Sequence, residues 1–234
     1  MLLEMINKLN TKHTEPINNW EFPMLIDYIT TNKLKEELET LFKEKKNDFK
    51  FFDRNGSAMY EWCRYNKKET PEAYDLIAFL HSTEWVRYLE ELTNIKGLIP
   101  DIHLHGAGYM RCGNGDSLKI HTDFNWNDTI KLNRVLTLVI YLNRDWKKEW
   151  NGDIQLWDKQ NKECVKRYFP DWGNCIIWEY DEYGFHGHPT PLDCPEGEYR
   201  DGFRLFYYTS NSTNQNPHRS LYWFDGEKAI DETK

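Results

Sequence analysis

The sequence predicts a mostly β domain, built as a sandwich or barrel, that follows a helical N-terminal region. Apolar residues recur at helical spacing before residue 100. From about Asp101 onward, the apolar segments become short and rich in β-branched and aromatic residues. Asn151-Gly152 and other glycine-containing turns separate these segments. Short strands punctuated in this way are typical of all-β sandwiches and barrels.

Three helices are expected in the N-terminal region. The first covers residues 32–44, where Lys and Glu occupy the face opposite the apolar one. The second begins at Pro71, because proline is favoured in the first turn of a helix and Thr70 can serve as the N-cap. The apolar faces consist of Leu34, Leu38, Leu41 and Phe42 in the first helix, and of Trp85, Val86, Leu89 and Leu92 in a third helix that follows Ser82.

The remaining chain is expected to complete a single domain spanning residues 1–234. Residues 1–100 would form mainly helical support and residues 101–210 the β core, while residues 211–234 would pack as a C-terminal extension that includes LYWF at 221–224. The predicted strands are 135–143, 152–158, 164–169, 174–180 and 203–210.

Composition excludes several classes of protein. With 234 residues and 15% aromatics, the chain can build a substantial core, so wholesale disorder is excluded. A net charge of −8 makes nucleic acid a poor partner, and no apolar run is long enough to span a membrane.

Two features of the sequence favour a cytoplasmic location. Glu4 and Lys8 interrupt the N-terminal apolar run, which argues against a signal peptide. Five widely spaced cysteines without a C-x-x-C motif favour reduced thiols in a cytoplasmic protein.

Three residues form a candidate metal site. His121 and Asp123 lie two residues apart in the predicted strand KIHTDF, so strand alternation places both side chains on one face, roughly 6–7 Å apart along the strand. His186, in FHGHP at 185–189, offers a third ligand. An H-x-D pair or a lone histidine also occurs by chance in surface and capping positions. Two imidazoles and one carboxylate together form the facial triad of non-haem Fe(II) oxygenases, which leaves positions for a co-substrate and dioxygen.

A candidate anion-binding residue lies beyond the third ligand. Arg200 is near the start of the last strong strand, and a guanidinium is the natural bidentate partner for a carboxylate. An oxygenase that uses 2-oxoglutarate needs such a partner for the distal carboxylate of this co-substrate.

Long stretches of residues 92–209 resemble the prolyl-4-hydroxylase-like branch of the Fe(II)/2-oxoglutarate-dependent dioxygenases, and in particular a group of bacterial and phage oxygenases in that branch. The resemblance implies a double-stranded β-helix core, also called a jelly roll or cupin-like fold, with flanking helices. It is carried by LTNIKGLIPDIHLHGAG, HTDFNWN, YLNRDWKKEWNGDIQLWD, FHGHPTPLDCPEG and YRDGFRLFYYT.

The resemblance also implies roles for individual residues. His121, Asp123 and His186 match the iron ligands, and Arg200 and Tyr141 match the residues that bind the distal carboxylate of 2-oxoglutarate. The residues after Arg200 depart from the family pattern, so Arg204, which shares strand parity with Arg200, competes for that role. Tyr141 can equally be a core aromatic residue in a buried strand.

The implied activity is hydroxylation of an unactivated C–H bond, with a prolyl residue in a peptide or protein as the first choice of substrate. Such an enzyme uses Fe(II), 2-oxoglutarate and O2, with ascorbate as a possible addition, and releases succinate and CO2. Because Asp123 fills the position that a halide would need, hydroxylation is favoured over halogenation. The alternatives are a hydroxylase of a free amino acid or saccharide-linked small molecule, a zinc or manganese enzyme with the same triad, and a non-catalytic jelly-roll binding protein.

Overall fold

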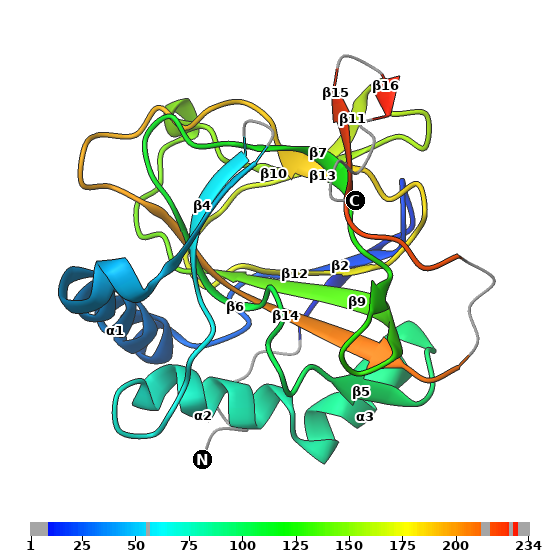
Figure 1. Ribbon diagram of the computed structural model, residues 1–234, viewed down its shortest axis with the longest axis horizontal. Helices are drawn as coiled ribbons and strands as arrows, with labels where there is room; N and C mark the ends of the chain where they lie inside the picture. The colour runs from blue at the N-terminus through cyan, green and yellow to red at the C-terminus, as the bar shows by residue number, and fades with distance from the viewer. Residues whose placement is uncertain (1–8, 55–56, 212–215, 225–226, 229–234) are drawn as a thin grey trace.

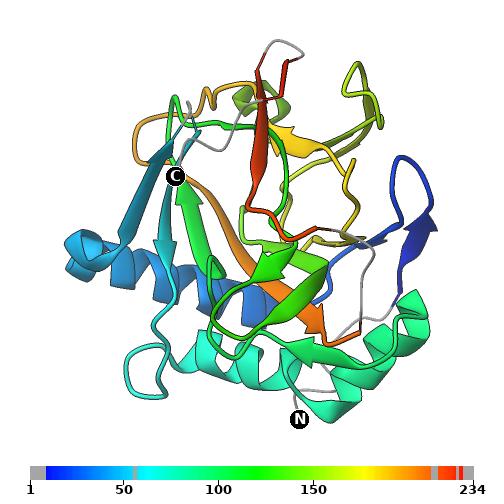
Figure 2. The same cartoon turned by 45° about the vertical axis from the view of Figure 1, so that its right-hand side comes forward.

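Two antiparallel sheets face each other, and three helices cover the outer side of the larger sheet (Figures 1 and 2). The computed structural model describes residues 9–54, 57–211, 216–224 and 227–228. In Figure 1 the helices lie along the lower part of the view, the larger sheet crosses the middle, and the smaller sheet lies at the top. The predicted mostly β fold, with a jelly-roll core and flanking helices, is confirmed.

The three predicted helices are present, although one cap differs from the prediction. Ser82 caps the third helix by accepting a hydrogen bond from the Trp85 backbone N–H. Thr70 precedes the second helix but does not cap it; instead the Glu37 carboxylate accepts hydrogen bonds from the first backbone N–H groups. The helices are α1 (Tyr28–Lys45), α2 (Pro71–Leu80) and α3 (Thr83–Thr93), with 3-10 turns η2 (Lys46–Asp48) and η3 (Lys148–Trp150).

The larger sheet has the strand order β1-β2-β12-β9-β14-β6-β4-β3, with β5 paired to β14 and β8 paired to β9. The long strands β9 and β14 pair along most of their length at its centre. Its strands are β1 (Thr11–His13), β2 (Asn19–Phe22), β3 (Lys50–Arg54), β4 (Ser57–Trp62), β5 (Leu98–Pro100), β6 (Gly108–Cys112), β8 (Trp126–Asn127), β9 (Leu132–Tyr141), β12 (Cys175–Glu179) and β14 (Arg200–Thr209).

The smaller sheet has the order β11-β10-β13-β7-β15-β16 and carries two of the three candidate metal ligands. Its strands are β7 (Leu118–Thr122), β10 (Ile154–Trp157), β11 (Cys164–Tyr168), β13 (His186–His188), β15 (Leu221–Phe224) and β16 (Glu227–Lys228).

Strand β9 lies between two apolar layers, which explains its continuous apolar sequence. Leu138 and Ile140 belong to the core shared with the helices, whereas Val139 and Tyr141 belong to the core between the sheets. An antiparallel strand normally alternates apolar and polar residues because one face meets water. Here the helices cover that face, so both sets of side chains are apolar.

The N-terminal region contributes strands as well as helices. The N-terminal region supplies the three helices, but it also contains strands of the larger sheet: β2 pairs with β12, and β4 pairs with β6. These strands are short and lie near the edges of the sheet, so their local sequence signal is weak. Only their long-range pairing shows that they belong to the β core.

The C-terminal segment is more than a packed extension. Strand β15 pairs with β7, and Tyr222 lies opposite His121 in the register. The segment therefore adds a strand directly beside a candidate metal ligand. Parts of the predicted extension, residues 212–215, 225–226 and 229–234, lie outside the described residues, as do residues 1–8 of the N-terminal segment.

Two sequence-based expectations concern the whole chain. All five cysteines are free thiols. In the part of the chain that the structure describes, every helix is too short or too polar to cross a membrane.

Candidate metal centre and co-substrate site

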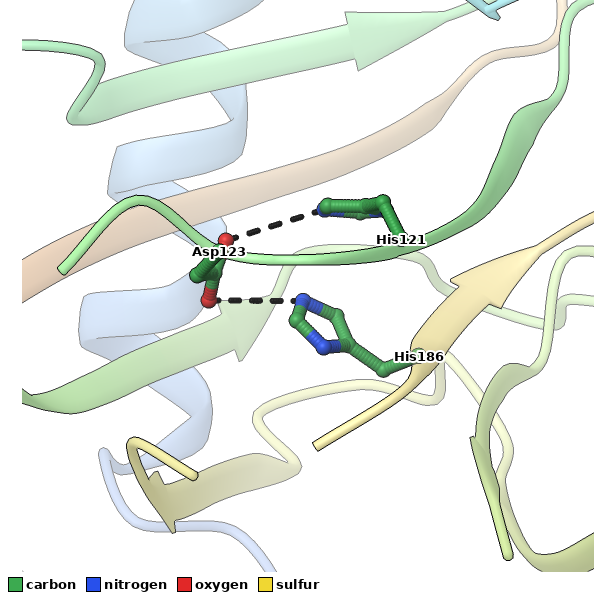
Figure 3. A group of neighbouring side chains, drawn as sticks. All are labelled: His121, Asp123 and His186. Atoms are coloured by element: carbon green, nitrogen blue, oxygen red, sulfur yellow. Dashed lines mark ion pairs between the residues drawn. The ribbon is translucent and has the colours of Figure 1, made fainter. Parts of the chain in front are cut away.

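The structure brings His121, Asp123 and His186 together. His121 and His186 lie opposite each other in the β7–β13 pair, with ring centroids 4.4 Å apart. Asp123 follows β7, and its two carboxylate oxygens lie 3.6 Å from His121 Nε2 and 3.4 Å from His186 Nε2 (Figure 3). One potential ligand atom from each residue lies within 4.8 Å of the others, so the three can hold one metal ion.

Backbone carbonyl groups orient both imidazoles. His121 Nδ1 lies 2.8 Å from the Lys119 carbonyl oxygen, and His186 Nδ1 lies 2.8 Å from the Gly184 carbonyl oxygen. A carbonyl oxygen only accepts hydrogen bonds, so in the neutral rings Nδ1 carries the proton and Nε2 carries the free lone pair. Both lone pairs are therefore available on the side where Asp123 lies, as metal binding requires.

Arg134 keeps Asp123 ionised. Its guanidinium donates a hydrogen bond to Asp123 Oδ2 and another to the Thr137 hydroxyl. Burial alone would raise the pKa of Asp123, but the positive charge of Arg134 and the interactions with the two histidines outweigh burial and hold this pKa well below its usual range. The carboxylate is therefore a charged acceptor, suited to a cation.

The sequence patterns did not predict two residues that contact the metal ligands. Arg134 packs its guanidinium 3.6 Å from the ring centroid of Phe206, and Tyr222 stacks on His121 with ring centroids 5.1 Å apart. A signal existed for Arg134, since an arginine directly before an apolar strand needs a buried partner. No comparable signal existed for Tyr222, because its contact depends on the pairing of β15 with β7.

Arg200 and Tyr141 also lie together inside the barrel. Arg200 donates from a terminal guanidinium nitrogen to the Tyr141 hydroxyl at 3.1 Å, and from Nε to the Gly152 carbonyl oxygen at 2.6 Å. Both side chains are buried. Gly152 has φ +85°, and a Cβ there would lie 2.9 Å from Arg200 Cδ, so this glycine permits the close approach.

Arg204 lies in different surroundings. Its guanidinium donates to Glu61 Oε1 at 2.7 Å and to the Gly106 carbonyl oxygen at 2.9 Å. It lines a cavity of about 150 Å³ together with His121 and Asp123. Arg204 thus has a carboxylate partner within the chain, whereas the hydrogen bonds of Arg200 go to a hydroxyl and a carbonyl oxygen.

Gly187 allows β13 to approach β7 closely. A Cβ at this position would meet the carbonyl oxygens of Leu118 at 2.6 Å and Lys119 at 2.8 Å. Both are backbone atoms of β7, which cannot move without displacing His121.

Gly187→Ala should lower the free energy of unfolding by about 1–3 kcal/mol, the usual range for overpacking. It should also weaken Fe(II) retention, because β13 must move away from β7. Denaturant unfolding and iron content after desalting measure the two effects. Gly113→Ala is the control, since its Cβ would meet only side-chain atoms, the Tyr199 ring at 3.4 Å and Asp116 Oδ2 at 3.7 Å, both at ordinary contact distances. Equal effects of the two substitutions would contradict the steric explanation.

Residues 106–207 match the family model described as the 2OG-Fe(II) oxygenase superfamily. The matched segment contains the triad, Tyr141 and Arg200. This match identifies residues 106–207 as a 2-oxoglutarate-dependent dioxygenase domain, a family that uses Fe(II) and 2-oxoglutarate, and the chain has a fold like that of prolyl-4-hydroxylases. Among curated proteins, none is significantly similar to this chain in sequence.

Solved structures support the same fold. A prolyl-4-hydroxylase of Pseudomonas putida superposes with a TM-score of 0.58 at 10% identity, covering 82% of this chain and 93% of that one. A prolyl hydroxylase of Trichoplax adhaerens, in complex with a hypoxia inducible factor peptide fragment, gives 0.56 at 15% identity over 81% and 83% of the two chains. HygX of Streptomyces hygroscopicus, with nickel and 2-oxoglutarate bound, gives 0.52 at 13% identity over 85% of each chain.

The residues present fit both groups that the family uses. Two imidazole lone pairs and one ionised carboxylate converge as the donor set of a divalent iron site. A buried guanidinium and a phenol hydroxyl lie together within the same domain. In the same strand as His186, the His188 imidazole is buried and both of its ring nitrogens lack a hydrogen-bond partner among the described residues.

Proposed function

We propose that this protein hydroxylates an unactivated C–H bond, with a prolyl residue of a peptide or protein as the first choice of substrate. In this proposal His121, Asp123 and His186 hold Fe(II), and Arg200 and Tyr141 bind the distal carboxylate of 2-oxoglutarate. One observation carries the proposal: the three converging ligand atoms and the buried arginine–tyrosine pair lie inside one oxygenase domain.

The chain's own residues have distinct tasks in this scheme. When bound, Fe(II) and 2-oxoglutarate activate dioxygen, and decarboxylation of 2-oxoglutarate to succinate and CO2 lets the second oxygen atom convert C–H to C–OH. Arg134 keeps Asp123 negatively charged. The family resemblance assigns Asp123 to the position that a halide would need, which favours hydroxylation. Arg200 orients the co-substrate through its far end.

Aromatic residues shield the histidines from water. Tyr222 stacks on His121, and the Trp178 ring lies 5.1 Å from His186. Both imidazoles are buried. Exclusion of water strengthens the electrostatic interactions within the site and protects reactive species from side reactions.

Fold similarity supports the prolyl substrate. Two of the similar structures are prolyl hydroxylases, and one of these was solved with a peptide fragment bound. At 10% and 15% identity these structures establish a shared fold, so the choice of substrate is a proposal that needs its own test.

A small polar molecule, such as a free amino acid or a saccharide-linked compound, is the second candidate substrate. The cavity at the triad is lined by the Arg204–Glu61 ion pair and by Lys50, which suit a charged or hydroxyl-rich ligand. HygX, which shares the fold with a TM-score of 0.51, was solved with hygromycin B bound.

The test is aerobic incubation with Fe(II), 2-oxoglutarate and three substrate panels: proline-containing peptides, free amino acids and aminoglycosides. Mass spectrometry measures the gain of one oxygen atom, and succinate is measured in parallel. We expect oxidised peptide and succinate in equal amounts. Oxidation of only the small molecules would replace the prolyl assignment with the second candidate. Failure of the iron-loaded protein to turn over 2-oxoglutarate with any panel would overturn the proposed function.

A further inference from the structure

His188 is a buried polar side chain that the scheme above does not use. Its relative exposure is 1%, and neither Nδ1 nor Nε2 has a hydrogen-bond partner among the described residues. Buried polar side-chain atoms in native proteins nearly always have a partner. An imidazole with two unpartnered nitrogens therefore indicates a group that binds to it when the site is filled.

The position of His188 indicates which group this is. It lies in β13 two residues after His186, so alternation along β13 directs both side chains to the same side of this strand, and the register against β7 shifts between them, from His121 to Leu118. Burial and the positive charge of Arg200 both lower the pKa of His188, so the Arg200 guanidinium lies within electrostatic range of this imidazole. His188 is thus two residues from an iron ligand and within electrostatic range of the arginine assigned to the distal carboxylate, the two groups that a bound 2-oxoglutarate would connect.

Two other roles for His188 fit the structure less well. It is not part of the cluster of converging ligand atoms, which in the described chain consists of His121, Asp123 and His186. A purely structural histidine would hydrogen-bond to the backbone, as His121 and His186 do through Nδ1. The side chain instead contributes an unused N–H to the inside of the barrel.

We propose that His188 is a third side chain of the co-substrate site and donates a hydrogen bond to the distal carboxylate of 2-oxoglutarate. This inference rests on the proposed function, because it takes Arg200 as the partner of the same carboxylate. An imidazole carries at least one N–H in either protonation state, and a carboxylate oxygen accepts from it. Arg200 provides the charged donor, Tyr141 the second, and His188 adds a third from another strand.

The direct test is calorimetric titration of 2-oxoglutarate into the Mn(II)-loaded protein, in which binding is measured without turnover. His188→Phe keeps a planar ring and removes the donor, so the dissociation constant for 2-oxoglutarate should rise about tenfold, the usual effect of losing a hydrogen bond to a charged group. His188→Gln keeps an N–H donor and should recover part of the affinity.

A second ligand locates the contact. 2-Oxopentanoate carries the same 2-oxo acid group but no distal carboxylate. If His188 contacts the distal carboxylate, His188→Phe should leave the affinity for 2-oxopentanoate unchanged. An equal loss for both ligands would overturn the assignment to that carboxylate.

Thermal unfolding separates a binding role from a structural one. Without ligand, His188→Phe should unfold at no lower temperature than the wild type, because an unpartnered buried polar group has been replaced by an apolar one. A clear drop in the unfolding temperature would assign His188 a structural role instead.

His81→Phe is the matched control for the binding measurement. His81 is partly buried, its Nε2 also lacks a partner among the described residues, and it lies at the end of α2. It should leave 2-oxoglutarate affinity unchanged.

The remaining outcomes are equally decisive. Unchanged affinity of His188→Phe for 2-oxoglutarate would overturn this inference alone, provided that Arg200→Ala binds more weakly. Loss of Mn(II) from His188→Phe would make His188 a metal ligand and also overturn it. If the metal-loaded wild type fails to bind 2-oxoglutarate, the proposed function itself fails.

Discussion

His186→Ala should abolish both Fe(II) retention and turnover. The substitution removes one of three protein ligands, and Nε2 of His186 lies 3.4 Å from Asp123 on the side that faces the proposed metal. Loss of a residue that only supports a metal ligand already costs about 10–100-fold in metal affinity. Loss of a ligand should cost more than that, so iron should be absent after desalting. Iron content, measured on the freshly loaded protein, checks the expectation.

His188→Ala is the matched control for this substitution. His188 lies in the same strand with the same parity, so the sequence pattern alone cannot separate the two histidines. In the structure, only His186 joins the converging group with His121 and Asp123 in the described chain. His188→Ala should therefore keep its iron. Iron loss in His188→Ala with retention in His186→Ala would reverse the assignment.

Arg200→Ala should raise the KM for 2-oxoglutarate about ten- to a hundredfold while iron binding stays nearly intact. The substitution removes a charge-assisted hydrogen bond, worth about 1.5–3 kcal/mol, and each 1.4 kcal/mol corresponds to about tenfold in binding. Arg200 is buried and its neighbour Tyr141 provides a second donor. Steady-state kinetics with varied 2-oxoglutarate, together with iron content, measure the two effects.

Arg204→Ala is the control for the carboxylate assignment. Its guanidinium is paired with Glu61, so this substitution should change the KM for 2-oxoglutarate little. It should instead affect substrate binding, since Arg204 lines the cavity at the triad. If Arg204→Ala raises the KM for 2-oxoglutarate and Arg200→Ala does not, the two arginines exchange roles.

Much of the fold could be predicted from local sequence patterns. Helical spacing of leucines identifies α1, and a continuous apolar run identifies β9. These elements are signalled within a single segment, so periodicity suffices. Strands β2, β4 and β15 could not be placed in this way, because each is short and is stabilised by pairing with a distant partner.

The residues of the candidate site also fall into those that local sequence patterns predict and those that only the structure reveals. The sequence alone determined the candidate donor set, His121, Asp123 and His186, because a predicted strand places two of these residues on one face and the third lies in a motif of the resembled family. It also identified Arg200 and Tyr141 as candidates for binding the distal carboxylate of 2-oxoglutarate. The structure brings the members of each group together.

Only the tertiary structure decided which further residues join these groups. Arg134 reaches Asp123, Tyr222 stacks on His121, and Arg204 pairs with Glu61 rather than with Tyr141. His188 has an unpartnered, buried ring within electrostatic range of Arg200 for the same reason. Each of these relations joins residues on different strands or loops. A sequence pattern reports which face of its own element a side chain occupies, whereas strand pairing and packing between sheets decide what lies opposite that face.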